Sequence, residues 1–174
     1  MNIHPIFVHF PIALLTIYAI LEILPIKKLQ NSATAENIKS FLVVFGALSS
    51  ILAYWTGGLA GEGIENGTLR HLIGVHSFFA GITVVIFIVI ASLYSVRFIS
   101  RAPIGARLMN SKIAPLWRLK LKVARMLDRR SILVSLAAVG LIALTITGGL
   151  GGAIVYGPDA DPIVKLVYKI FVGN

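Results

Sequence analysis

The sequence contains no cysteine in 174 residues, and only 13% of its residues are charged. The lack of cysteine excludes disulfide bonds, thiolate metal sites, iron–sulfur clusters, cysteine nucleophiles and haem attached through thioethers. Soluble domains carry about 25% charged and about 45–50% apolar residues. Here 57% of the residues are hydrophobic and the mean hydropathy is +0.88. These values exclude a disordered chain and argue against a water-soluble monomer.

Four apolar segments have the length that a helix needs to cross a bilayer, which is about 20 residues. The segments are Pro5–Ile26, Lys39–Gly61, Leu72–Val96 and Ser131–Tyr156. A segment inside lipid must satisfy its own backbone hydrogen bonds, so we expect all four to be helices. The first segment has no basic region before it and no small-residue cleavage site, which indicates a retained span. The predicted fold class is an all-α integral membrane protein with four transmembrane helices.

Basic residues outnumber acidic ones by 16 to 7, and thirteen of the sixteen follow the first or the third apolar segment. The positive-inside rule therefore predicts a multi-pass protein of a prokaryotic cytoplasmic (inner) membrane, with both termini outside the cytoplasm. Basic loops beside a membrane contact lipid headgroups, so the lipid bilayer is the expected partner and nucleic acid is not.

Two further segments have the pattern of amphipathic helices. Residues 115–130 alternate apolar and basic positions at helical spacing, which predicts a basic interfacial helix on the cytoplasmic side. Lys120 falls on the apolar face of this helix and must extend its amine toward the interface. The tail, residues 157–174, is expected on the outer face with a shorter amphipathic helix over Ile163–Val172.

The two halves of the chain resemble each other. His-Pro-Ile-Phe-Val-His at 4–9 matches His-Leu-Ile-Gly-Val-His at 71–76 in four of six positions. Thr-Gly-Gly-Leu-Ala-Gly at 56–61 matches Thr-Gly-Gly-Leu-Gly-Gly at 147–152 in five of six. We therefore predict one membrane domain, residues 1–174, built from two hairpins, 1–61 and 70–156. The second hairpin contains the basic loop 97–130. Both would start outside, as a parallel repeat about an axis along the membrane normal.

Every histidine of the chain lies in this repeat. Histidines within membrane spans usually face the bundle interior, and His9 and His76 fall inside the first and third spans. Two imidazoles from opposed helices suit the axial ligation of a b-type haem, so His9 and His76 are the predicted metal ligands. His4 and His71 would lie nearer the surface and contact haem propionates, together with Arg70. They could instead ligate a second haem or another metal.

The glycine runs would leave room for a flat porphyrin between the helices. The candidate cofactor-binding glycines are Gly57, Gly58, Gly61, Gly148, Gly149 and Gly152. Close helix–helix packing through small residues explains the same runs without a ligand. Two alternatives to haem stay open: a copper or zinc site, since imidazole suits both metals, and a structural subunit without a cofactor.

Three sequence stretches also resemble a known family. His4–Leu14, Thr56–Gly61 and Gly151–Tyr156 are similar to motifs of the domain-of-unknown-function 2231 family of predicted four-span membrane proteins. The resemblance implies that the histidines bind haem b and that c-type cytochromes or other membrane subunits are partners. It matches the third-span histidine to His76. Many members carry a further histidine where this chain has Gly157-Pro158-Asp159.

The expected function is that of a b-type cytochrome-like, haem-binding subunit. Two histidine ligands leave no open iron position, which favours electron transfer over oxygen chemistry. The haem would lie near the outer face, where it would pass single electrons within a larger respiratory assembly. No nucleophile, base and orienting group occur at workable spacing, so the sequence names no catalytic residue and leaves enzymatic activity undecided.

Overall fold

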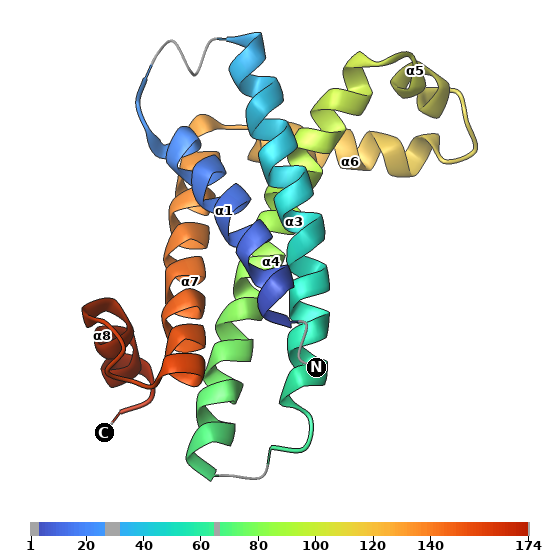
Figure 1. Cartoon of the computed structure of the whole chain (residues 1–174). Helices are drawn as coiled ribbons and strands as arrows, with labels where there is room; N and C mark the ends of the chain where they lie inside the picture. The colour runs from blue at the N-terminus through green and yellow to red at the C-terminus, as the bar shows by residue number, and fades with distance from the viewer. Residues whose placement is uncertain (1–3, 27–31, 65–66, 174) are drawn as a thin grey trace.

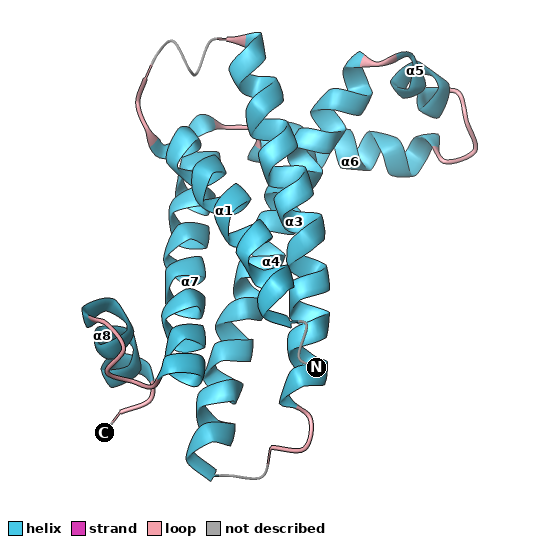
Figure 2. Ribbon diagram, in the orientation of Figure 1, coloured by secondary structure: helices cyan, strands magenta, loops and turns pink. Residues whose placement is uncertain are grey.

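The computed structural model describes residues 4–26, 32–64 and 67–173, with the side chains of residues 4–6 excepted, and these residues form helices and no strand. The helices are α1 (His4–Ile23), α3 (Ala33–Gly61), α4 (Gly67–Arg101), α5 (Pro103–Met109), α6 (Ala114–Leu127), α7 (Arg130–Tyr156) and α8 (Pro162–Phe171). Figure 2 shows these helices together with the described loops and turns beside them. The predicted all-α class is therefore confirmed.

Three helices, α3, α4 and α7, are long and apolar enough to cross a membrane. The remaining predicted span, Pro5–Ile26, corresponds to α1, whose apolar stretch Phe7–Ile23 is shorter. All four helices extend to or beyond the segments predicted from hydropathy at one end or both, because hydropathy marks the lipid-facing part of a helix and not its ends. Ser32 caps α3 by accepting a hydrogen bond from the Ala35 backbone N–H at 3.4 Å.

The four apolar helices pack as a bundle in which α1 and α4 each contact both α3 and α7 (Figure 1). The helices α1 and α4 thus occupy diagonal positions. We call the end where α4 leads into α5 and α6 the basic end. The opposite end, where α3 leads toward α4 and where α8 lies against α7, is called the distal end.

The predicted interfacial helix corresponds to α6, with Pro115 in its first turn. It lies beside α4 and α5 at the basic end and exposes Arg118, Lys122 and Arg125. The short helix α5 was not expected, because residues 97–130 read as one loop with a single helix. Pro103 stands in its first turn, and Gly105 lets it fold closely onto the last turn of α4, where a Cβ would meet the Ile99 carbonyl oxygen.

The predicted tail helix corresponds to α8. Asp161 caps it by accepting hydrogen bonds from the backbone N–H groups of Ile163 and Val164 at 2.8 and 2.9 Å. Its buried residues Val164 and Val167 pack in a cluster with Leu72 of α4 and Leu150 of α7. In the preceding link, Asp159 accepts a hydrogen bond from Lys165, which raises the pKa of that lysine. The helix α8 therefore covers the distal part of α4 and α7.

The main core lies nearer the basic end. Tyr18 of α1 is fully buried, and its ring packs edge-on against Phe87 and Tyr94 of α4, with centroids 6.3 and 5.8 Å away. Leu15 of α1 lies over Gly46 of α3 so closely that a Cβ there would stand 2.5 Å from a Leu15 methyl carbon. The Tyr18 contacts join the two hairpins across the diagonal of the bundle, and the Leu15–Gly46 contact closes the first hairpin.

A buried polar cluster closes the core at the basic end. The Glu22 carboxylate accepts hydrogen bonds from the Lys39 amine and the Tyr94 hydroxyl, both at 2.8 Å. The Glu22 and Lys39 side chains are only 5% and 11% exposed. Arg97 lies over the Tyr94 ring, 4.9 Å from its centroid, and forms an ion pair with Asp128. The cluster thereby connects α1, α3 and α4 with the residue that ends α6.

We expect Lys39→Met to destabilise the fold by about 3 kcal/mol or more, because it leaves the buried Glu22 charge without its cation. The double variant Glu22→Leu, Lys39→Met should recover most of that loss, since it removes both charges. Thermal unfolding of the purified protein in detergent measures both effects.

The control is Lys165→Met, which breaks the exposed Asp159 pair and should change the unfolding temperature little. Equal unfolding temperatures for Lys39→Met and the control would contradict a structural role for the buried pair.

Candidate functional site

The structure describes the side chains of three of the four histidines. His9 lies in the second turn of α1 and is exposed, and His71 is exposed near the start of α4. His76, one and a half turns further along α4, is half-buried. His4 is the first residue of α1, and its side chain lies outside the described residues.

His76 is held in place by α7. Its Nδ1 atom lies 3.0 Å from the backbone carbonyl oxygen of Thr147. A carbonyl oxygen only accepts hydrogen bonds, so Nδ1 must carry a proton and donate it. In the neutral imidazole, Nε2 is then the nitrogen that bears the lone pair. Metal-ligating histidines commonly have this arrangement, in which a backbone carbonyl fixes the tautomer and the ring orientation.

Two threonines extend the polar surroundings of His76. Thr147 and Thr83 place their hydroxyl oxygens 3.4 Å apart between α7 and α4. Each hydroxyl also donates to a carbonyl in its own helix, that of Ala143 or Phe79. His76, Thr83 and Thr147 therefore form a polar cluster at the α4–α7 contact, which we call the His76 cluster.

The histidines of the two halves lie at different levels along the bundle. Tyr18 of α1 meets α4 between Phe87 and Tyr94. Nine residues of α1 advance at most about 13.5 Å along the bundle, because α1 is tilted relative to α4 (Figure 1), so His9 lies no further toward the distal end than residues 81–82 of α4. His76 lies five to six residues nearer the distal end, about 8 Å at 1.5 Å per residue. The expectation from the repeat, that matched histidines share one depth, therefore differs from the structure.

His4 lies five residues before His9 on α1, so its backbone is nearer the level of His76 than that of His9 is. His9 and His76 lie at different levels because the two helices of each hairpin pack in a different register in the two halves. In the first, Leu15 lies over Gly46, which puts the 56–61 run opposite the start of α1. In the second, Phe87 lies over Gly140, which puts the 147–152 run opposite His76.

The candidate glycines meet several different neighbours. Gly149 and Gly152 face Val167 and Val164 of α8. A Cβ added at these glycines would stand 3.1 and 2.9 Å from the two valine side chains, so the glycines let α8 pack closely on α7. Gly61 lies against Ile73 of α4, whereas a Cβ at Gly58 or Gly148 would meet nothing within 4 Å. Gly57 is half-buried.

Gly151 lies close to a histidine ring. A Cβ at this position would stand 3.3 Å from Cε1 of His76 and 3.7 Å from its Nδ1. Thr83 and Thr147 were not predicted as site residues, whereas Gly151 belongs to the glycine run that was expected to leave room for a cofactor. The sequence signal for Gly151 and Thr147 was their place in the repeated run, but that run alone does not say which glycine meets the ring.

The distal rim carries the other predicted polar residues. Arg70 and His71 are both exposed on the first turns of α4. Among the described side chains, no group of three or more histidine, aspartate or glutamate residues is placed to hold a metal ion.

No protein family model, curated protein or solved structure matches the chain. The resemblance to the domain-of-unknown-function 2231 family therefore stays a prediction.

We expect Gly151→Val to push the His76 ring from the Thr147 carbonyl and to destabilise the α4–α7 contact by about 1–3 kcal/mol, as overpacking does. Gly148→Val is the matched control, because the same change three residues earlier meets open space. Thermal unfolding in detergent compares the two variants. A control variant that unfolds as early as Gly151→Val would contradict this account of the histidine contact.

Proposed function

We propose that the chain is a four-span, b-type haem-binding membrane protein that transfers single electrons near the distal end of its bundle. His76 would hold the haem iron from α4. The observation that supports it best is the hydrogen bond between Nδ1 and the Thr147 carbonyl, which fixes the ring orientation and makes Nε2 the nitrogen that would donate to iron. Glycine at 151 lets this ring lie against α7.

The second ligand comes from α1, diagonally across the bundle from α4. The sequence pattern favours His9, whereas the level along the bundle favours His4. We propose His4, because two ligands of one iron must approach it from a common level. Ligation by two histidines takes up both axial positions of the iron, which suits electron transfer. Haem supplies the redox chemistry, while the chain orients the imidazoles and provides apolar surroundings.

Several features support the membrane setting. The basic residues of α6 and the links beside it lie at one end, whereas the His76 cluster lies toward the other. By the positive-inside rule the distal end faces away from the cytoplasm of a prokaryotic cell. A haem near one face reaches only one side, so electron exchange requires c-type cytochromes or further membrane subunits there.

The decisive experiment is a reduced-minus-oxidised spectrum with a pyridine haemochrome assay on protein purified with added haem. We expect about one b-type haem per chain, and its loss in His76→Ala. His4→Ala should lose more haem than His9→Ala. His71→Ala is the control and should retain haem.

Absence of haem from the folded parent protein, or full haem content in His76→Ala, would overturn the proposal. Copper or zinc found by elemental analysis in place of haem would favour the metal-site alternative. Haem lost in His9→Ala but kept in His4→Ala would restore the ligand pair predicted from the sequence.

A further inference from the structure

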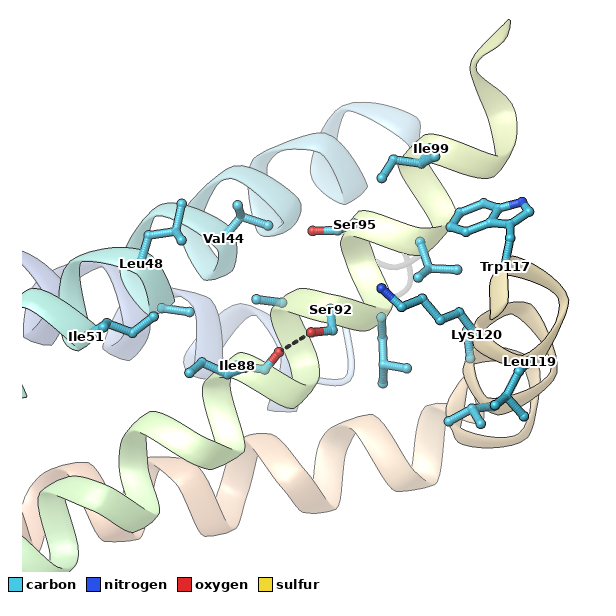
Figure 3. A pocket seen from close by; sticks show the side chains of 16 residues that line it. Val44, Leu48, Ile51, Ile88, Ser92, Ser95, Ile99, Trp117, Leu119 and Lys120 are labelled. Carbon is cyan, nitrogen blue, oxygen red and sulfur yellow. Dashed lines mark hydrogen bonds between the residues drawn. The ribbon is translucent and has the colours of Figure 1, made fainter. Parts of the chain in front are cut away.

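A groove between α3, α4 and α6 lies apart from the histidines, at the basic end. It has a volume of about 510 Å³, within the range of small-molecule sites, about 300–1,000 Å³. Hydrocarbon side chains form most of its walls, among them Val44, Leu48 and Ile51 of α3 and Ile88 of α4 (Figure 3). Trp117 and Lys120 of α6 close one end.

The length of the groove matches one leaflet of a bilayer. Its lining on α4 runs from Ile88 to Ile99, which is about 16 Å of helix. One leaflet contributes about half of the hydrocarbon core of about 30 Å. The amphipathic helix α6, with Trp117 at the groove, marks the headgroup level. An acyl chain can therefore extend from α6 along the groove into the membrane.

The polar groups of the groove gather at its α6 end. Figure 3 shows the Lys120 amine extended toward α4, on the side where Ser92 and Ser95 lie. The Ser92 hydroxyl donates its hydrogen bond to the Ile88 carbonyl at 2.8 Å, so its oxygen can still accept. The described lining holds one cation and no carboxylate.

The acidic residues at this end are already engaged with other cations. Glu22 pairs with Lys39, Glu36 with Arg97 and Arg101, and Asp128 with Arg97. No ion pair or hydrogen bond between described side chains includes Lys120. The exposed Lys120 ammonium can therefore bind an anion from outside the protein, because the described side chains place none on it.

We propose that this groove binds an anionic phospholipid, with one acyl chain along α3 and α4 and the headgroup phosphate on the Lys120 amine. The exposed Arg118 and Lys122 of α6 add positive potential around the headgroup, which favours a lipid with net negative charge. This site is independent of haem binding.

Trp117 reports on the groove directly, because it is buried against it and is one of only two tryptophans. Trp55→Phe leaves Trp117 as the single tryptophan. This protein is reconstituted into phosphatidylcholine vesicles. A fraction of their lipid is brominated in the acyl chains, and the brominated lipid is either phosphatidylglycerol or phosphatidylcholine. Bromine quenches tryptophan fluorescence at close range, so quenching measures which lipid occupies the groove.

We expect brominated phosphatidylglycerol to quench Trp117 about three- to tenfold more effectively than brominated phosphatidylcholine, since only the lipid with net negative charge is favoured by the positive potential at Lys120. Lys120→Gln should abolish the preference. Lys122→Gln, two residues away but outside the groove, should keep most of the preference, because Lys122 adds only to the general positive potential around the headgroup. Ser92→Phe fills the groove and should reduce quenching by both lipids.

Equal quenching by the two lipids in the Trp55→Phe protein would overturn the proposal. An equal loss of preference in Lys120→Gln and Lys122→Gln would also overturn it, because attraction to the general surface charge of α6 would then suffice. Circular dichroism and gel-filtration elution verify that each variant is folded.

Discussion

The buried Glu22 carboxylate is the interaction on which the bundle arrangement depends. It accepts from Lys39 of α3 and Tyr94 of α4 while belonging to α1, so one group fixes three helices at a single level. A charge in this position is costly unless it is paired. Any sliding of α1 along its neighbours would break the pair. The rings of Tyr18 and Phe87 pack against each other next to this level, so the position of Glu22 also fixes which rings meet in the core.

This anchoring divides the bundle into two parts of different character. Near the basic end, aromatic rings and ion pairs fill the space between the diagonal helices α1 and α4. Toward the distal end, the α4–α7 contact includes a half-buried histidine and two threonine hydroxyls, and α8 supplies separate apolar cover. Polar side chains thus occur in both regions, but the half-buried histidine lies in the distal one, where two helices meet. That placement, more than residue type, makes His76 a candidate ligand.

Much of the fold could be predicted from the sequence, because lipid burial and helical periodicity leave strong patterns. The segment Ser131–Tyr156 agrees with α7 to one residue, and residues 115–130 contain most of α6. The short helix α5 was not predicted, since the seven residues Pro103–Met109 are too few for a periodic signal. The partners of the glycines were not predicted either. A run of small residues shows that something approaches closely, but only packing shows that α8 meets Gly149 and that His76 meets Gly151.

The repeat shows why residue matching can misplace a site. The two halves keep the same histidines and glycine runs, yet the hairpins pack in different registers, so His76 lies opposite its run whereas His9 does not. Helix contacts repeat every three to four residues, so a helix can slide by whole turns and still bury a similar face. Two side chains can share one ligand only if they lie close together along the bundle, and matching sequence motifs do not guarantee this. The level of His4 along α1 therefore carries more weight for a shared ligand than the matched position of His9.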